Sequence, residues 1–168
     1  MIMNAAYKTK KTLHDRLILI DIENYNGGPI TSRTQSRWCH RTLLNWIKPR
    51  VEDLIVLAAD KTTVTNLHGD WGANRILAGH GENGADLRLL EVLGENVVDR
   101  FEEIVLVSGD HIFTERVSAL AGDGVPTTVY SHARSLSLRL ALAAGTVITS
   151  PSTPLPASPA TPILERTA

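Results

Sequence analysis

The sequence has little cysteine and no long hydrophobic run. Cys39 is the single cysteine among 168 residues, so no disulfide can form within the chain, which suits a reducing compartment. The lysines near the N-terminus, Lys8, Lys10 and Lys11, are not followed by an apolar segment long enough for a signal sequence or a membrane span. The next apolar run covers only residues 17–20. We therefore expect a cytoplasmic protein without a membrane partner.

A strong excess of charge of either sign is also absent. The net charge is −1 and the pI is about 6.6, in a chain that is 43% hydrophobic and 21% charged. This composition is typical of a globular domain. A nearly neutral chain does not coat nucleic acid through bulk electrostatics, so any binding to phosphate needs a local patch or a metal ion.

Several motifs of well-known sites are missing. The six histidines have no metal-ligand spacing, and the glycine-rich residues 79–84 lack both the Lys-Ser/Thr of a P-loop and the G-x-G-x-x-G order. No glycine fingerprint of a dinucleotide-binding domain follows residue 22. Glu23 stands where the D-x-D pattern of haloacid-type phosphatases has its second aspartate. A magnesium-dependent phosphohydrolase and a nucleotide-binding domain are therefore lower-ranked alternatives.

Short apolar segments alternate with amphipathic segments along the chain. Apolar runs predict strands at residues 16–22, 53–59, 74–78, 103–107, 125–130 and 146–149. Apolar residues at helical spacing predict helices, the first capped by Thr31 or Ser32, up to about residue 48 and at 85–98, 111–121 and 136–144. Residues 60–72 lack clear periodicity and are expected to form a loop with at most one helical turn. The alternation predicts a three-layer α/β/α fold with a central parallel sheet and right-handed crossovers.

The composition changes at both ends of the chain. We expect residues 1–14 to form a flexible arm and residues 15–149 to form one domain. Five of the eight prolines lie within residues 151–162, among Ser, Thr and Ala. Residues 150–168 are therefore expected to be a disordered proline-rich tail.

Three aspartates lie at the ends of predicted elements. Asp21 ends the first strand, Asp110 follows the fourth, and Asp86 lies in the first turn of a helix that begins at the same edge of the sheet. Ligands of open parallel sheets bind outside the carboxyl ends of the strands. We therefore expect the three carboxylates to meet there, although each one taken singly is also explained by helix capping or the helix dipole.

The helical phase of two of these aspartates turns them toward the core. Asp86 is in phase with the apolar residues 90, 93 and 97, and Asp110 with residues 113, 117 and 120. A carboxylate facing a core is costly unless it is paired or bound to a metal, and three such groups close together repel one another. A divalent cation removes both costs. Because the ligands are oxygens only, we expect Mg²⁺ or Mn²⁺ at Asp21, Asp86 and Asp110.

A family resemblance rests on these same residues. The segments IDIEN, GADLRLLEVL and VLVSGDHIF, in this order and spacing, resemble the NYN domain, a branch of the PIN-like ribonucleases. The resemblance extends over residues 17–149 and implies a PIN-like, Rossmann-like topology. It also implies hydrolysis of RNA phosphodiester bonds by a metal-activated water, with Asp21, Asp86 and Asp110 as the catalytic metal ligands. By the same resemblance, Asn24 is the amide companion of Asp21, and Ser108 orients the loop that presents Asp110.

The sequence departs from the family pattern at one position. Many PIN-like enzymes have a further acid two residues after the last aspartate, where this chain has Ile112. Glu23 supplies the missing carboxylate if the first strand continues that far, since it then faces the same side as Asp21. The departure leaves open whether one or two metals bind. It also leaves open the alternative of a catalytically weakened module that binds RNA or protein.

Positive side chains are available to hold RNA. Arg33, Arg37 and Arg41 form a stripe on the polar face of the first long helix, and Lys61 follows the second strand. A solvated helix face is the commoner explanation of such a stripe. We expect RNA, single-stranded or structured, as the partner. A homo-oligomer and a protein partner for the proline-rich tail both remain open.

Overall fold

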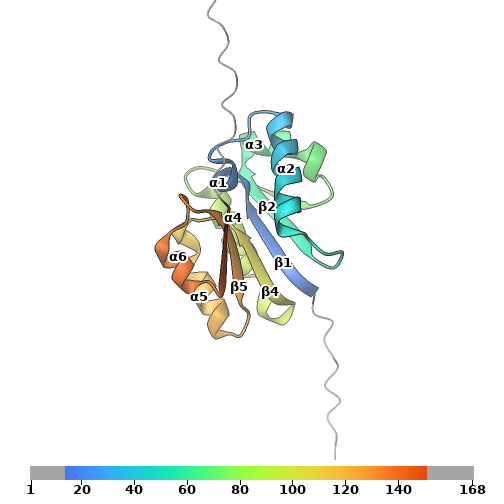
Figure 1. Ribbon diagram of the computed structural model, residues 1–168. Coiled ribbons are helices and arrows are strands. Elements are labelled where there is room, and N and C mark those ends of the chain that lie inside the picture. Colours follow the sequence, from blue (N-terminus) through green and yellow to red (C-terminus); the bar gives the residue numbers. More distant parts are fainter. Residues whose placement is uncertain (1–13, 151–168) are drawn as a thin grey trace, which may run out of the picture.

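A six-stranded parallel sheet forms the centre of the protein. The computed structural model describes residues 14–150, with the strands in the order β3-β2-β1-β4-β5-β6 (Figure 1). The strands are β1 (His14–Asp21), β2 (Leu54–Asp60), β3 (Arg75–Gly79), β4 (Phe101–Val107), β5 (Thr127–His132) and β6 (Thr146–Ser150). All neighbouring strands are parallel. The predicted three-layer α/β/α fold with a parallel sheet is confirmed.

Helices cover both faces of this sheet. The helical elements are α1 (Ile22–Asn26), α2 (Arg33–Ile47), α3 (Lys61–Trp71), α4 (Gly84–Leu93), η1 (Val97–Asp99), η2 (His111–Phe113), α5 (Thr114–Gly122) and α6 (Leu138–Ala143). The core on one side joins the sheet to α2 and α3, and the core on the other side joins it to α4, α5 and α6. Figure 1 shows these two layers on opposite sides of the strands.

The first strand supplies side chains to both cores. Leu17 and Leu19 pack on the side of α4 and α5, whereas Ile18 and Ile20 pack on the side of α2 and α3. All four are at most 1% exposed. A central parallel strand is buried on both faces, which is why its sequence is continuously apolar rather than alternating.

The strand order reverses at β1. The chain runs from β1 outward through β2 to β3, and then crosses back to place β4 on the other side of β1. The residues Ile20 and Val107 pair near the carboxyl ends of these two strands. Such a switch point opens a crevice at the carboxyl edge of the sheet.

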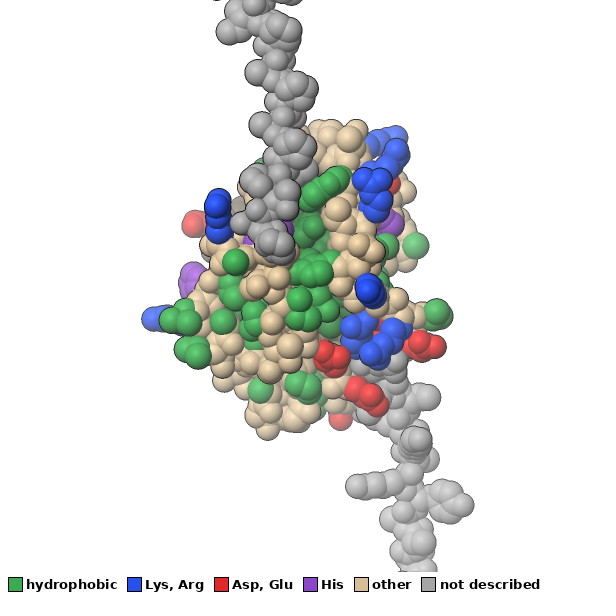
Figure 2. All heavy atoms as spheres, viewed as in Figure 1, with side chains coloured by type: hydrophobic (Ala, Val, Ile, Leu, Met, Phe, Trp, Pro, Cys, Tyr) green, Lys and Arg blue, Asp and Glu red, His purple; other side chains and the backbone are tan. Residues whose placement is uncertain are grey.

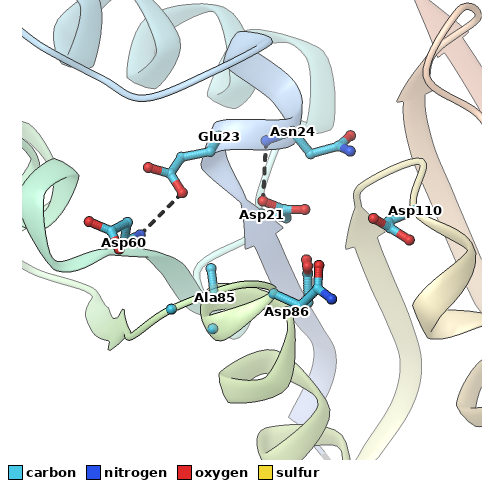
Figure 3. A pocket seen from close by; sticks show the side chains of 10 residues that line it. Asp21, Glu23, Asn24, Asp60, Ala85, Asp86 and Asp110 are labelled. Atoms are coloured by element: carbon cyan, nitrogen blue, oxygen red, sulfur yellow. Dashed lines mark hydrogen bonds between the residues drawn. The ribbon is translucent and has the colours of Figure 1, made fainter.

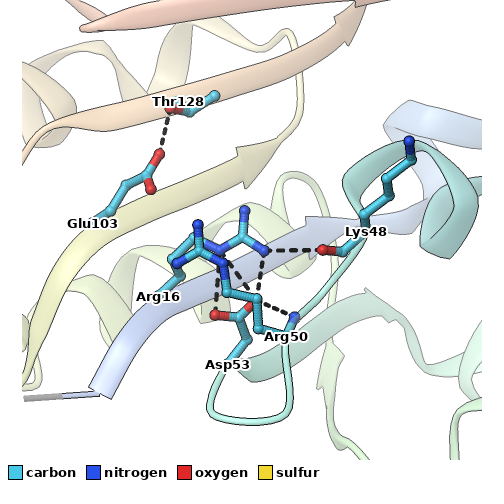
Figure 4. Close-up of polar contacts among 6 residues, drawn as sticks. All are labelled: Arg16, Lys48, Arg50, Asp53, Glu103 and Thr128. Carbon is cyan, nitrogen blue, oxygen red and sulfur yellow. Dashed lines mark hydrogen bonds and ion pairs between the residues drawn. The ribbon is translucent and has the colours of Figure 1, made fainter.

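A buried ion pair closes the opposite, amino edge of the sheet (Figure 4). The guanidinium of Arg16, near the start of β1, contacts the carboxylate of Asp53 at 2.6 Å, and the Asp53 side chain is fully buried. Nearby, the Thr128 hydroxyl donates to the Glu103 carboxylate at 2.6 Å and joins β5 to β4. These polar side chains at the amino edge therefore satisfy one another's hydrogen bonds.

Aromatic side chains pack between α1, α2 and β5. The rings of Tyr25 and Trp38 stack with centroids 6.2 Å apart, and Trp46 meets Tyr130 edge-on at 5.0 Å. His132 stacks on Tyr25 at 5.0 Å. Figure 2 shows hydrophobic side chains gathered at the centre of this face of the molecule. Tyr25 and Tyr130 are each 8% exposed, so these two rings belong to the core.

The prediction of a loop at residues 60–72 is wrong, because residues 61–71 form α3. Its buried stripe is Thr63, Leu67 and Trp71. The stripe begins with a polar residue, so the apolar periodicity is too weak to identify the helix. The Asp60 side chain caps the helix by accepting a hydrogen bond from the Thr62 backbone at 2.9 Å.

Other element boundaries also differ from the predictions. The first strand ends at Asp21, because residues 22–26 form the short helix α1, which Gly27 ends with a φ of 77°. The helix α4 ends at Leu93 instead of continuing to residue 98, and Gly94 provides its cap. The helix expected at 111–121 begins as a turn of 3-10 helix. Ser32, one of the two predicted caps, caps α2.

Two further predictions concern the ends of the chain. The flexible arm and the proline-rich tail lie outside the described residues, except that His14 and Ser150 belong to β1 and β6. Between residues 14 and 150, no helix has both the length and the apolar character that a membrane span needs.

Candidate metal centre

A pocket of about 230 Å³ lies at the carboxyl edge of the sheet, beside the crevice between β1 and β4 (Figure 3). Its walls come from the ends of β1 and β2, the helix α1, the loop after β4, and the start of α4 with the loop before it. The lining residues are Asp21, Glu23, Asn24, Asp60, Gly81, Asn83, Gly84, Ala85, Asp86 and Asp110. The structure therefore brings the three predicted aspartates to one pocket.

Asp21 is the last residue of β1 and the cap of α1. Its carboxylate accepts a hydrogen bond from the Asn24 backbone at 3.2 Å and one from the Ser108 hydroxyl at 3.0 Å. The side chain is almost completely buried, with the residue 5% exposed. Asp21 is thus held from both sides of the crevice between β1 and β4.

The loop after β4 is tied to the loop after β1. The Ser108 hydroxyl that donates to Asp21 also accepts a hydrogen bond from the Asp110 backbone at 3.2 Å. The Gly109 backbone donates to the side-chain oxygen of Asn24 at 3.0 Å. Ser108 and Asn24 therefore lie where they can orient Asp21 and the loop that carries Asp110.

Gly109 allows this loop to pack closely. A Cβ on this residue would overlap the carbonyl oxygen of Ser135 and approach the Ser131 hydroxyl at 2.6 Å. The sequence does not reveal this requirement, since Ser131 and Ser135 are far from residue 109 in the chain.

Asp86 reaches the pocket because α4 starts very close to the sheet. A Cβ on Gly79, the last residue of β3, would overlap the backbone of Gly84, the first residue of α4. Asp86 is only 9% exposed, which confirms that it lies on the buried face of the helix. The buried stripe differs from the prediction, because Leu89 and Val92 are buried, Leu90 is half-buried, and residue 97 lies beyond the end of α4.

Asp21 and Asp86 form a buried pair of like charges. Burial, with the charge of Asp86 and a hydrogen bond between the two carboxyl groups, raises the pKa of Asp21 from its ordinary value of 3.8 to about 7. Burial also raises the pKa of Asp86, as do the charges of Asp110 and Glu23. Without a cation, the pair therefore holds a proton near neutral pH.

Asp110 is more exposed than its helical phase predicts. Its side chain is 32% exposed and lines the pocket. One carboxylate oxygen accepts from the Ile112 backbone at 2.9 Å and lies 3.2 Å from Nδ1 of His111. Asp110 is the N-cap of η2, and its side chain bonds to the Ile112 backbone instead of packing in the core with Phe113.

Glu23 reaches the pocket by a route that differs from the expected one. The first strand does not continue to residue 23, so the strand alternation does not apply, and α1 instead carries the side chain. Its carboxylate accepts hydrogen bonds from the Asp60 backbone at 3.1 Å and from the Thr63 hydroxyl. Asp60 is a pocket residue that the sequence reasoning missed, since α3 and its capping aspartate were not recognised.

The donor set of the pocket fits a hard cation. All its charged donors are carboxylates, which favour Mg²⁺ or Mn²⁺, and a cation would relieve the repulsion between Asp21 and Asp86. Within residues 14–150, however, no three acidic, histidine or cysteine side chains are arranged as a complete set of metal ligands. Asp21 and Asp86 are the two buried acids of the candidate centre, and Asp110 and Glu23 also line it.

The positive residues considered for RNA binding lie outside the pocket lining. Arg37 and Arg41 are on the exposed side of α2, and Arg37 forms an ion pair with Asp70 of α3 at 3.4 Å. Lys61 is the exposed first residue of α3, next to the pocket residue Asp60. Of these positive residues, Lys61 is therefore the one adjacent in the sequence to an acid of the pocket.

Comparison with known proteins identifies a shared fold. No family model matches the sequence, and no curated protein matches it. Among solved structures, the chain is similar to the crystal structure of a protein of unknown function from Vibrio parahaemolyticus. The TM-score is 0.58 and the sequence identity is 20%, over 82% of this chain and 93% of that chain. The chain therefore shares its α/β fold with that protein, and its function has to be inferred from the acidic pocket.

Proposed function

We propose that the protein is a metal-dependent endoribonuclease and that the acidic pocket is its active site. The observation that carries this proposal is the charge of the pocket. None of its described lining residues is Lys or Arg, and five are acids: Asp21, Glu23, Asp60, Asp86 and Asp110. Such a pocket repels a phosphate group unless a cation lies between them. The pocket therefore suits a reaction on a phosphate ester that requires a bound metal.

Two carboxylates would form the core of the metal site. Asp21 and Asp86 would hold Mg²⁺ or Mn²⁺, with Asp110 and Glu23 as further oxygen donors on the walls of the same pocket. When bound, a divalent cation supplies Lewis-acid chemistry, which lowers the pKa of a water molecule and offsets the charge that develops on the phosphate.

The protein's own residues fix the position of these acids. Ser108 holds Asp21 by a hydrogen bond, and the contact between Gly109 and Asn24 keeps the loops after β1 and β4 together. Asp110 lines the pocket with a partly exposed side chain, and its carboxylate can orient a water molecule or accept a proton from it. No nucleophilic side chain is needed for this chemistry.

The resemblance to the NYN domain supports RNA as the phosphate ester. The motifs that carry the resemblance contain Asp21, Asp86 and Asp110, which line one pocket. The resemblance also implies products with 5′-phosphate and 3′-hydroxyl ends.

The test is cleavage of labelled single-stranded RNA and tRNA with Mn²⁺, with Mg²⁺ and with EDTA. Wild-type protein should cleave RNA only with metal, and Asp110→Asn should lose most of the activity. Asp123→Asn is the matched control, because Asp123 is an exposed aspartate after α5 and does not line the pocket. Cleavage in EDTA, or full activity of Asp110→Asn, would refute the proposal.

A binding module with weakened catalysis is the second candidate. Two observations favour it: Ile112 replaces the additional acid of many PIN-like enzymes, and no complete set of metal ligands is preformed within the described residues. A calorimetric titration of the protein with Mn²⁺ separates the two candidates. Binding that is lost in Asp21→Asn supports the enzyme, and no binding by the wild-type protein supports the module.

A further inference from the structure

One face of the sheet is left partly open beside α2. On this side α2 and α3 pack on β1 and β2, and Figure 1 shows β4 and β5 with no described helix in front of them. Tyr130 of β5 and Ile148 of β6 turn their side chains to this side. A parallel sheet normally has both faces covered, because its strands carry apolar side chains on both. Within residues 14–150, this part of the sheet therefore lacks the covering layer that its sequence calls for.

Aromatic side chains border the open area. Trp38 and Trp46 of α2, together with His132 and Ile148, are half-buried, and we call these four residues the aromatic surface. The rings of Trp46 and His132 are 6.4 Å apart and nearly parallel, and Tyr25 lies stacked beneath His132 at 5.0 Å. The hydrophobic side chains at the centre of Figure 2 lie on this face of the molecule. The half-buried rings thus offer apolar area to a further segment of chain.

The described part of the chain ends beside this surface. The Ser150 hydroxyl lies 2.6 Å from Nδ1 of His132, and Nε2 of His132 lies 2.8 Å from the backbone oxygen of Tyr25. A carbonyl oxygen only accepts, so in the neutral imidazole Nε2 carries the proton and the Ser150 hydroxyl donates to Nδ1. Ser150 is therefore fixed against a ring of the aromatic surface, and the chain continues from that point.

The residues that follow have the sequence of a polyproline II ligand. Pro156, Pro159 and Pro162 are spaced by three, and residues 151–164 contain no charged side chain. A polyproline II helix has three residues per turn, so these three prolines share one edge of such a helix. Proline-rich segments in this conformation bind surfaces that are lined by aromatic rings. The chemistry of the segment thus matches the surface at which it begins.

We propose that residues 154–162 dock as a polyproline II helix on the aromatic surface of their own chain. Residues 151–153 provide the turn back from the end of β6. Residues 154–162 span about 25 Å in this conformation, which is enough to cross the aromatic surface. Because Ser150 tethers the segment, its effective concentration at the surface is high, and weak ring contacts suffice to hold it. The inference goes beyond the proposed ribonuclease function and does not depend on it.

The experiment uses the full-length chain with a bimane fluorophore on Ser158→Cys. Residue 158 is out of phase with the proline edge, so the label leaves that edge free. Cys39 stays unlabelled, because its side chain is fully buried and burial raises the pKa of its thiol to about 12. Tryptophan quenches bimane on contact. The label should therefore be quenched, and replacing both Trp38 and Trp46 by phenylalanine should remove most of the quenching.

Two further variants separate docking from a general change in the protein. The triple replacement of Pro156, Pro159 and Pro162 by serine should also remove most of the quenching, and it changes no residue of the described domain. The matched control is Trp71→Phe, because Trp71 is fully buried and cannot touch the label. Its label should stay as strongly quenched as that of the unmodified background. Circular dichroism verifies that each variant is folded.

A dilution series decides which chain occupies the surface. Quenching within one chain should not change with protein concentration. Quenching that grows with concentration would place the segment on a second copy, and a label that is unquenched at every concentration would leave the surface to another partner; each of these results overturns the inference. It is equally overturned if quenching persists in the triple proline variant or is lost in Trp71→Phe.

Discussion

The Ser108 hydroxyl donates a hydrogen bond to the Asp21 carboxylate across 3.0 Å, and this contact joins the ends of the two central strands, β1 and β4. The same hydroxyl accepts from the Asp110 backbone. One small side chain thus sets the positions of two acids that lie in different crossover units of the fold.

Replacing Ser108 by alanine should therefore lower RNA cleavage by about 10- to 100-fold, the usual cost of losing a group that orients a metal ligand. Stability should change far less than activity. The matched control is Ser36→Ala, since Ser36 is a buried serine of α2 whose hydroxyl has no partner among the described residues. Equal activity of Ser108→Ala and wild-type protein would show that Asp21 needs no such support.

Asp21 should make the stability of the metal-free protein depend on pH. Its pKa is 3.8 in the unfolded chain and about 7 in the folded protein, so the folded state binds the proton more tightly. The stability that Asp21 contributes is then fully present below pH 3.8, and is lost as the pH rises through about 7. In EDTA at pH 8, Asp21→Asn should raise Tm by on the order of 5 °C, because it removes a buried charge.

This difference in Tm between Asp21→Asn and the wild-type protein should shrink as the pH is lowered toward 5. Thermal unfolding across this range, with and without Mg²⁺, measures it. Mg²⁺ should raise the Tm of the wild-type protein at pH 8 and have little effect on the variant. A Tm difference that is independent of pH would show that Asp21 is already ionised in the folded protein at pH 5.

Gly109→Ala should damage both the pocket and the fold. The new Cβ would overlap the carbonyl oxygen of Ser135, so the loop after β4 has to move and carry Asp110 with it. We expect a loss of about 2 kcal/mol in the free energy of unfolding, measured by urea denaturation, and a large loss of cleavage. Gly122→Ala is the control, since a Cβ at Gly122 meets nothing within 4 Å. Both variants should behave alike if the close packing at Gly109 has no importance.

Asp53→Ala should destabilise the protein at the edge opposite the pocket. The substitution leaves the guanidinium of Arg16 buried without its carboxylate, which typically costs about 3 kcal/mol. The exposed pair of Arg75 and Glu95 provides the comparison, because Glu95→Ala should cost less than about 1 kcal/mol. Both values come from urea denaturation, and similar losses for the two variants would mean that burial of the first pair contributes nothing.

Much of the fold could be predicted from the sequence, because local patterns determine it. The apolar run of β1 and the amphipathic pattern of α2 are visible within a few residues of sequence. The rule that ligands bind at the carboxyl ends of parallel strands then placed Asp21, Asp86 and Asp110 on one edge. The structure brings all three to one pocket.

The features that were missed depend on long-range contacts or on weak local patterns. The sequence of α3 predicts a loop because a threonine begins its buried stripe, and without the helix nothing identifies Asp60 as its cap. Strand alternation brings Glu23 to the side of Asp21 only if the first strand continues, whereas Asp21 caps a helix there. The close packing at Gly109 depends on Ser135, which no local pattern connects with it.

The return of the chain from β3 to β4 has a consequence for synthesis. A chain that has folded only as far as β3 and α4 contains Asp21 and Asp86, but neither Ser108 nor Asp110. Since this half leaves the ribosome first, the two acids gain their support only when β4 docks beside β1. For the ribonuclease proposed here, the nascent chain would therefore stay inactive toward its own messenger RNA until most of the domain has been translated.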